Sequence, residues 1–264
     1  MDLERVRTIV DKEWAEVFKN RMVVFTVLFM PLIFTVLPIG LLIAMRSAGA
    51  SGGDSTDMPA LFASTCKGLT SFDCIQVYMI NQFLLLYMVM PMSIPIAIAA
   101  YSVVGEKTTR SLEPLLATPI TTVELLLGKG IAAVLPAVVA TWACFGLFVL
   151  LLFPIGATPG LIRYVLGPTW ITAILVVGPL MAVMAVNAAM MVSSRVSDPR
   201  AAEQISMVVI VPVLGAMFGQ IGGLFVINAQ FVWISALVLL VIDGVLVYLG
   251  ARLFQRETIL TQWR

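Results

Sequence analysis

The sequence predicts an all-α integral membrane protein with six transmembrane helices and an N-terminal amphipathic helix at the interface. Three observations support this class. Of 264 residues, 60% are hydrophobic and only 12% are charged, whereas charged residues make up about a quarter of a typical soluble domain. Several long runs contain no charge at all, and the positive charges are concentrated in alternate connecting segments.

The uncharged runs give the number of spans. A helix needs roughly 20 apolar residues to cross the hydrocarbon core of a bilayer. The first four runs, 22–45, 77–104, 130–153 and 169–194, each suffice for one crossing. The fifth run, 204–242, is about twice that length and can cross twice when residues 244–251 are added. We expect its break at the polar sequence Asn228-Ala-Gln230.

Residues 2–20 show apolar side chains at helical spacing, with charges on the other face. This pattern predicts a helix that lies along the membrane surface, with its tryptophan at the depth of the headgroups. It serves either as an anchor alone or also as part of a docking surface for a soluble partner. The apolar residues are Leu3, Val6, Ile9, Val10, Trp14, Val17 and Phe18. The first uncharged run begins only at Met22 and is too long for a signal-peptide core, so we expect it to remain as a span.

The positions of lysine and arginine predict the orientation, because cytoplasmic segments retain positive charge during insertion. Both termini are therefore expected in the cytosol. The basic residues on the predicted cytosolic side are Arg5, Arg7, Lys12, Lys19, Arg21, Lys107, Arg110, Lys129, Arg195, Arg200, Arg252, Arg256 and Arg264. Only Arg46, Lys67 and Arg163 lie on the other side. These charges are not dense enough to predict binding of nucleic acid.

Three cysteines are present, and no histidine. Cys66 and Cys74 lie in the external loop, where they form either a disulfide or two free thiols. Cys144 lies inside the third span and is expected to be a small packing residue. Without histidine or further ligands nearby, a metal site is not expected, and Ser–His or His–metal catalysis within the membrane is excluded.

Between the second and third spans lies the charged segment "VVGEKTTRSLEPLLATPITTVELLLGKGIA", residues 103–132. Its first part predicts a short helix, because Glu106, Arg110 and Glu113 lie four and three residues apart and can support one another on one face. Leucines give that helix an apolar stripe. On pattern alone, the helix either seals the end of the bundle or projects rigidly from it as a binding site for a soluble partner. The stripe consists of Leu112, Leu115 and Leu116.

Local signals end this short helix and begin the elements that follow. Thr118 precedes Pro119, and a residue before proline resists helical geometry. Thr121 and Glu124 then form a capping box at the start of the third span. Asp198-Pro199, an N-cap followed by proline at the first helical position, starts the fifth span. In that span, Gly215, Gly219 and Gly223 lie four residues apart, which favours close helix packing.

Four segments resemble ABC-2-type transporter permeases and together extend over the whole chain. "GEKTTRSLEPLLATPITTVELLLGK" is similar to the hallmark segment of this family. "VDKEWAEVFKNR" is similar to its interfacial helix, "SSRVSDPRAAEQIS" to its second cytosolic loop, and "ARLFQRETIL" to its C-terminal end. The sequence resembles the drug, lipid or sodium exporter branch more closely than the O-antigen branch.

The resemblance implies that the 264 residues form one ABC-2-type transmembrane domain. Six spans make half of a membrane-embedded dimer, with a second copy or a close paralogue as the other half. Two separate ATPase subunits carry ATP and Mg, whereas this chain carries no cofactor. The parts are a cytosolic interfacial helix (1–21), an external loop (46–76), a cytosolic coupling segment (105–129), a second cytosolic loop (195–203) and a cytosolic tail (252–264).

The resemblance also assigns roles to residues. The coupling helix sits in a cleft of the ATPase, and the end of the fifth span forms short re-entrant helices around Gln220, Gly222 and Gly223. The residues that it implies face the ATPase are Glu106, Arg110, Leu112, Glu113, Leu115 and Leu116. The chain itself is not expected to hydrolyse ATP. A phosphate-binding loop needs G-x-x-x-x-G-K-[ST], and here Gly128-Lys129 continues with Gly130.

We therefore expect the permease subunit of an exporter in a prokaryotic plasma membrane, which moves a hydrophobic or amphiphilic substrate by alternating access. The alternative is a passive channel or scaffold that is not coupled to ATP. Asp243 is an ionisable group within the last apolar region, with either a structural or a functional role. Aromatic and methionine side chains either line a path or face lipid. Candidate path residues are Phe25, Phe29, Phe83, Tyr87, Met88, Met90, Asn187, Gln220 and Asp243.

Overall fold

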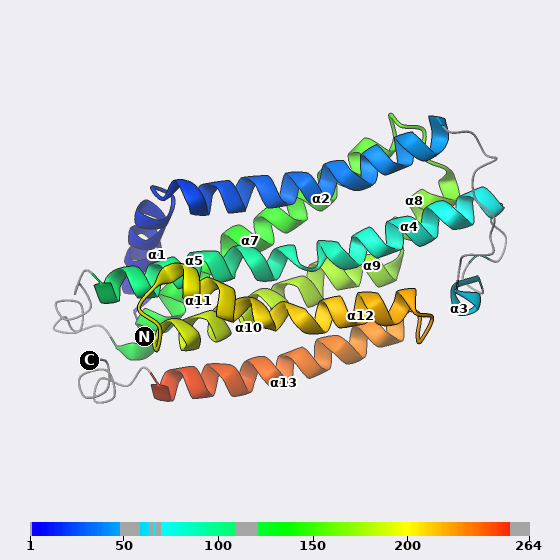
Figure 1. Cartoon of the computed structure of the whole chain (residues 1–264). Coiled ribbons are helices and arrows are strands. Elements are labelled where there is room, and N and C mark those ends of the chain that lie inside the picture. The colour runs from blue at the N-terminus through cyan, green and yellow to red at the C-terminus, as the bar shows by residue number, and fades with distance from the viewer. Residues whose placement is uncertain (1, 48–58, 64–65, 67–69, 109–120, 254–264) are drawn as a thin grey trace.

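The computed structural model describes residues 2–47, 59–63, 66, 70–108 and 121–253 (Figure 1). All regular elements within these ranges are helical. Six helical stretches are long and apolar enough to cross a membrane, which confirms the predicted fold class and the number of spans. The stretches are Val23–Ser47, Ser71–Thr108, Val123–Leu152, Pro159–Ser193, Pro199–Ile221 and Ala229–Leu253.

The helices form an elongated bundle in which one span is central. This second span consists of α4 (Ser71–Tyr87) and α5 (Met90–Thr108), and it is the most deeply buried of the six. Its half α5 packs most extensively against α10 (Gly178–Ser193) and α7 (Thr122–Leu152). The other long helices at the periphery are α2 (Arg21–Ser47), α12 (Val211–Ile221) and α13 (Ala229–Leu253).

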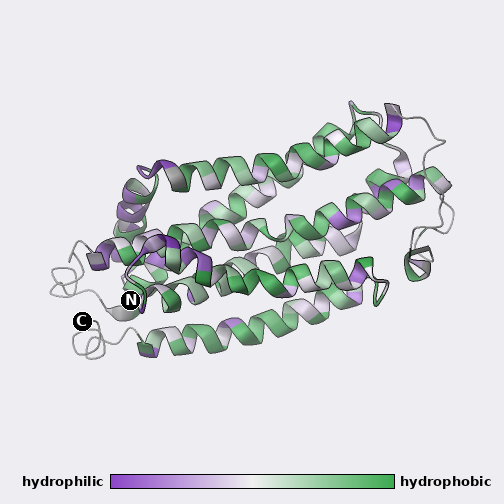
Figure 2. Ribbon diagram, viewed as in Figure 1, coloured by the Kyte–Doolittle hydropathy of each residue, from purple (hydrophilic) through white to green (hydrophobic). Residues whose placement is uncertain are grey.

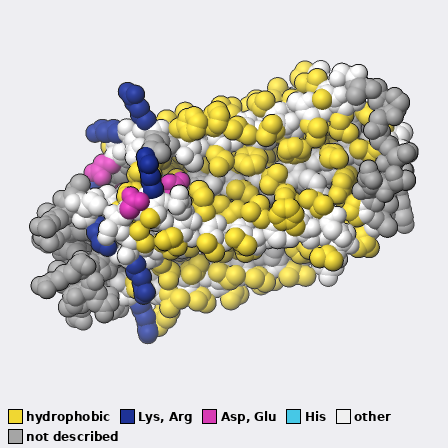
Figure 3. Space-filling model, viewed as in Figure 1, with side chains coloured by type: hydrophobic (Ala, Val, Ile, Leu, Met, Phe, Trp, Pro, Cys, Tyr) yellow, Lys and Arg dark blue, Asp and Glu magenta, His cyan; other side chains and the backbone are white. Residues whose placement is uncertain are grey.

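Polar residues gather at the two ends of the bundle, and apolar residues cover its flanks (Figure 2). The charged side chains visible on one face lie at a single end (Figure 3). This end holds α1 (Leu3–Val17), the C-terminal turns of α5 and α13, and the start of α7. We call it the charged end, and the other the opposite end. The apolar flank between them is the surface expected of a multi-pass membrane protein.

Proline interrupts the second span. α4 ends at Tyr87, a turn follows, and α5 begins at Met90 immediately before Pro91. Because proline has no backbone N–H, it fits the first turn of a helix but breaks the interior of one. Pro95 lies farther along, inside α5. The central span is therefore divided into two helices at this turn.

The fourth span contains a π-helical turn, Ala173–Val177, between α9 (Pro168–Thr172) and α10. In this turn the Gly178 N–H donates to the carbonyl oxygen of Ala173, five residues back. The same pattern would pair the Ile174 carbonyl with residue 179, but Pro179 has no N–H to give. The indole Nε1 of Trp142 on α7 donates to that oxygen instead, at 3.1 Å. The indole thus gives the Ile174 carbonyl a hydrogen-bond donor at a position where lipid offers none.

The fifth span begins as predicted. The Asp198 side chain accepts a hydrogen bond from the Ala201 N–H, and Pro199 opens α11 (Pro199–Ser206). A 3₁₀ turn, Met207–Ile210, connects α11 to α12. The sixth span starts one residue after Asn228, whose Oδ1 accepts a hydrogen bond from the Phe231 N–H. The run therefore divides into two spans as predicted, but the break lies at residues 222–228, slightly before the predicted position 228–230, because residues 229 and 230 already belong to α13.

The expectation that the end of the fifth span forms short re-entrant helices is wrong. Among the described residues, α12 continues to Ile221 and no short helix lies between it and α13. Gly223 has a φ of 69° and ends α12 with a Schellman motif, in which the Leu224 N–H donates to the Gly219 oxygen at 2.9 Å. The chain then leads through a short turn directly into α13. The glycine stripe also has another role than helix packing, since Gly219 lies against Phe225 in the turn, and a Cβ on Gly215 would meet no atom within 4 Å.

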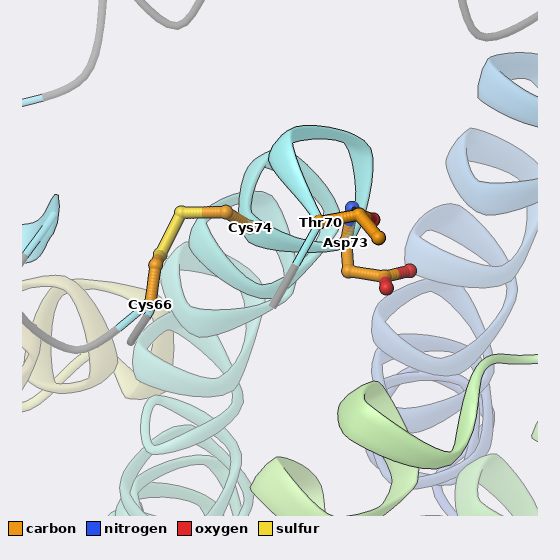
Figure 4. The surroundings of a disulfide bond; sticks show 4 residues. All are labelled: Cys66, Thr70, Asp73 and Cys74. Atoms are coloured by element: carbon orange, nitrogen blue, oxygen red, sulfur yellow. Dashed lines mark hydrogen bonds between the residues drawn. A yellow bond between two sulfur atoms is a disulfide. The ribbon is translucent and has the colours of Figure 1, made fainter. Parts of the chain in front are cut away.

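At the opposite end, part of the external loop folds back over the bundle. A disulfide joins Cys66 to Cys74 on α4, with Cα atoms 5.4 Å apart (Figure 4). Before it, in α3 (Ala60–Ala63), Phe62 packs edge-on against Tyr78, with ring centroids 5.0 Å apart. Pro59 reaches the turn after α12, where a Cβ on Gly223 would lie 3.2 Å from it. The disulfide thus fastens this loop across the ends of α4 and α12.

Candidate functional site: the base of the charged segment

The amphipathic helix α1 packs against α7 and α5 at the charged end. Asp2 caps it by accepting a hydrogen bond from the Glu4 N–H. Its buried face repeats every three or four residues, as an α-helical stripe requires. The residues of this face are Val6, Ile9, Val10, Glu13 and Val17. One of these five buried residues, Glu13, therefore carries a carboxylate.

Two contacts fix the position of α1 along α7. A Cβ on Gly128 would lie 2.6 Å from Cγ2 and 2.8 Å from Cβ of Ile9, so only glycine permits this approach. One turn farther along α7, the indole Nε1 of Trp14 donates to the Ala132 carbonyl oxygen at 2.9 Å. The tryptophan is thus bound to the bundle. Whether this helix lies at the membrane surface, as its pattern predicts, stays a prediction.

Four charged side chains from three helices meet beneath α1. We call Lys12, Glu13, Glu106 and Lys129 the basal ion cluster. Lys129 Nζ on α7 lies 2.6 Å from Glu13 Oε1 on α1 and 2.8 Å from Glu106 Oε2 on α5. Lys12 Nζ lies 2.7 Å from Glu106 Oε1. Lys129 also donates to the Ser102 hydroxyl at 2.7 Å.

The cluster is electrically balanced and largely closed to water. Its two lysines offset its two glutamates, and Glu13, Glu106 and Lys129 are each at most 6% exposed. Partial burial alone would lower the pKa of the Lys12 ammonium, but the hydrogen bond and the charge of Glu106 raise the pKa overall. Lys12 is thus expected to be charged at neutral pH. Removal of one partner from such a buried pair leaves a charge without compensation.

Glu124 makes a second connection between α1 and α7. With Thr121 it forms the predicted capping box, in which its Oε2 accepts from the Thr121 N–H at 2.9 Å. Its Oε1 accepts from the Asp2 N–H at 2.8 Å, at the start of α1. Arg5 adds a longer ion pair, with Nη1 at 4.0 Å from Oε2. One carboxylate therefore caps α7 and holds the first turn of α1.

These contacts enclose the charged segment from both sides. Glu106 lies in the last turns of α5, before residues 109–120, and Glu124 lies in the first turn of α7, after them. Glu106 is 5% exposed, and its carboxylate faces two lysines of this chain. The other residues expected to face an ATPase lie outside the described residues. They are Arg110, Leu112, Glu113, Leu115 and Leu116.

Three members of the cluster, Lys12, Glu13 and Lys129, are not among the site residues predicted from the sequence. A signal is present for two of them. Glu13 lies on the apolar face of α1, in phase with Val10 and Val17. Lys129 lies beyond the first turn of an otherwise apolar helix. A charge in such a position requires a partner.

The structure places the predicted path residues in different parts of the bundle. Asn187 lines an apolar groove of about 640 Å³ between α7, α10 and α13. Phe29 and Phe25 line a smaller hollow on the outer face of α2. Tyr87, Gln220 and Asp243 are buried, whereas Phe83 is partly exposed. The described residues also contain no group of three or more Cys, Asp or Glu side chains placed to hold a metal.

Comparison with known proteins agrees with the fold and with the resemblance noted in the sequence. No curated protein matches the chain. A family model, described as ABC-2 family transporter protein, matches residues 7–241. The match begins within α1 and ends within α13, so it includes the first five spans, about half of the sixth and the basal ion cluster. The chain therefore belongs to the ABC-2 family of transporter proteins and is a transport subunit of the membrane.

Proposed function

We propose that this chain is the permease subunit of an ATP-binding cassette exporter, and that it moves a hydrophobic or amphiphilic substrate across a prokaryotic plasma membrane. Two such chains, identical or closely related, form the membrane part. Two separate ATPase subunits bind at the charged end, which faces the cytosol, and they hold the ATP and Mg. The excess of lysine and arginine in the segments at this end supports the orientation.

The observation that carries the proposal is the attachment of α1 to both sides of the charged segment. Before the segment, Lys12 of α1 binds Glu106, and Lys129 of α7 joins the same carboxylate to Glu13 of α1. After the segment, Glu124 accepts a hydrogen bond from the first residue before α1, Asp2. A connecting loop that only joins two spans needs no such support. A segment that receives a push from a partner does, because the force must reach the spans rather than deform the loop.

The basal ion cluster suggests how that force is passed on. Its ion pairs join α1, α5 and α7, so a displacement of the segment moves these three helices together. Separation of the buried charges would cost several kcal/mol, which favours movement as one body. α5 is also the central helix of the bundle and packs against α10. Closure of the ATPases would thus shift the core of the bundle and alternate the access of a cavity between the two chains.

The first test is purification of the tagged chain from its native cells in a gentle detergent, followed by mass spectrometry of the bound proteins. We expect a P-loop ATPase at one copy per permease chain. A chain that purifies without an ATPase, as a stable oligomer that conducts ions, would instead support a passive channel.

A second test uses the charged segment itself. Glu113→Ala is expected to reduce transport at least tenfold and to weaken ATPase binding, while insertion into the membrane stays normal. The matched control is Glu4→Ala, because Glu4 is an exposed acid of α1 that takes part in no contact of the cluster. Equal transport by both variants would count against coupling through this segment.

A further inference from the structure

The apolar groove between α7, α10 and α13 has no role in the proposed coupling. Its volume is about 640 Å³, within the range of roughly 300–1,000 Å³ that is usual for ligand sites. Asn187 is the only side chain in its lining with a carboxamide, and the amide nitrogen already donates to the Val183 carbonyl at 2.8 Å. Most other lining residues are aliphatic, from Val123 at the charged end to Trp142 and Leu175 farther into the bundle.

The depth of the groove matches one leaflet of a bilayer. Lys129, in the basal ion cluster, marks the level of the charged groups on α7, and Trp142 follows 13 residues later on the same helix. At about 1.5 Å per residue this is roughly 20 Å, somewhat more than half of a hydrocarbon core about 30 Å thick. The groove therefore extends from the headgroups at the charged end to about the middle of the membrane.

A positive charge lies next to the α13 wall of the groove, at the charged end. Ala251 and Val247 form its α13 wall, and Arg252 follows Ala251 at the exposed end of the helix. The Arg252 guanidinium stacks over the Tyr248 ring, 4.7 Å from its centroid. Such stacking fixes the charge at the interface and leaves the N–H donors at the edge of the guanidinium for a phosphate. Basic residues at this depth attract anionic headgroups.

Gly130 lines the middle of the groove, and a Cβ at this position would meet no atom within 4 Å. Glycine destabilises a helix interior by about 1 kcal/mol relative to alanine. Its neighbour Gly128 is required by Ile9, but no protein contact requires Gly130. The missing side chain widens the groove where an acyl chain would lie.

We propose that this groove binds one acyl chain of an anionic phospholipid from the leaflet at the charged end, with the phosphate beside Arg252. Three features support this occupant: an aliphatic lining, a length that matches one leaflet, and a cation on the residue that follows its α13 wall. The inference does not depend on the proposed function, since a lipid can bind here whether or not an ATPase drives the chain.

The test is photo-crosslinking in nanodiscs of phosphatidylcholine that contain phosphatidylglycerol with a diazirine at the end of one acyl chain. Peptide mapping of the wild-type chain is expected to place the main adducts near Trp142 and Leu175. Gly130→Leu, which fills the groove, is expected to reduce these adducts at least fivefold. Gly146→Leu is the matched control, because Gly146 lies on the same helix, also has open space at its Cβ and is not part of the groove.

Two further variants complete the test. Arg252→Gln is expected to reduce the preference for phosphatidylglycerol over a phosphatidylcholine probe about fivefold. Val183→Phe fills the groove from α10 and replaces Gly130→Leu if that variant does not elute as a single species. Equal labelling of all six spans would show an annular lipid only, and adducts unchanged in both groove-filling variants would overturn the proposal. Labelling lost because a second copy covers α7 would overturn it as well.

Discussion

At the scale of single residues, Lys129 has the greatest influence on the charged end. Its ammonium lies within 2.8 Å of two carboxylates that come from different helices. Neither carboxylate is open to bulk water. Burial of such charges costs several kcal/mol per ion, and only close pairing offsets this cost. Lys129 therefore stabilises the position of α1, although its own charge is unfavourable in an otherwise apolar helix.

Lys129→Gln is expected to lower the stability of the purified protein by about 3–5 kcal/mol, because Glu13 and Glu106 then lose their shared cation. Thermal unfolding in detergent, followed by intrinsic fluorescence, measures the change. Lys19→Gln is the control, since Lys19 is exposed and outside the cluster. A melting temperature equal to that of the control would show that the cluster contributes no net stability.

Asp243 is the opposite case, a buried carboxyl without compensation. It is 7% exposed, and neither oxygen has a hydrogen-bond partner among the described residues. An unsatisfied polar group of this kind costs about 1–3 kcal/mol. Asp243→Leu is therefore expected to raise the melting temperature, whereas Val247→Leu, one turn away, is expected to change it little. A decrease for Asp243→Leu would mean that a cation or a second chain stabilises the carboxyl in the membrane.

At the scale of helices, two neighbouring glycines of α7 differ in what surrounds them. Gly128 touches Ile9 of α1, whereas Gly130 faces open space. Gly128→Ala is expected to displace α1, because the nearest atoms of Ile9 include Cβ, which cannot move without its helix. Gly130→Ala is expected to be neutral or to stabilise by up to about 1 kcal/mol. Protease sensitivity of residues 2–20 would report the displacement, and equal protection in the two variants would contradict it.

The same helices show what the sequence could and could not predict. Features that are determined by residues close together in the sequence were predictable. They include the six spans, the capping box at Thr121 and the start of the fifth span at Asp198. The pairing of Lys129 with Glu13 was not, because 116 residues separate them and only the packed fold brings them together. The end of α12 was predicted wrongly, because the spacing of glycines does not reveal that Gly223 adopts a positive φ.

The disulfide at the opposite end connects a short loop to α4. In the chain-entropy model, a loop of this length contributes about 2–3 kcal/mol. Cys74→Ser is therefore expected to lower the melting temperature and to expose Phe62, which packs against Tyr78. Cys144→Ser serves as the control, because this thiol is unpaired. If reduction of the wild-type chain leaves the melting temperature unchanged, the disulfide does not stabilise the loop.

At the scale of the whole molecule, the two ends of the bundle differ in how they are fastened. At the charged end, ion pairs and a capping carboxylate hold α1 against α5 and α7. At the opposite end, a covalent bond holds the external loop. A disulfide persists in an oxidising compartment, whereas lysine and arginine mark the cytosolic side. Both types of fastening agree with the proposed orientation, in which the charged end faces the cytosol, although they depend on different physics.

This orientation can be measured in intact cells with a thiol reagent that does not cross membranes. In a Cys144→Ala background, Leu166→Cys places a thiol at the opposite end, and Ser197→Cys places one in the exposed turn between α10 and α11. Because basic segments resist translocation, we expect the reagent to label residue 166 at once and residue 197 only after the cells are permeabilised. The reverse pattern would place the charged end outside, where no cytosolic ATPase could reach it, and the proposed coupling would then be wrong.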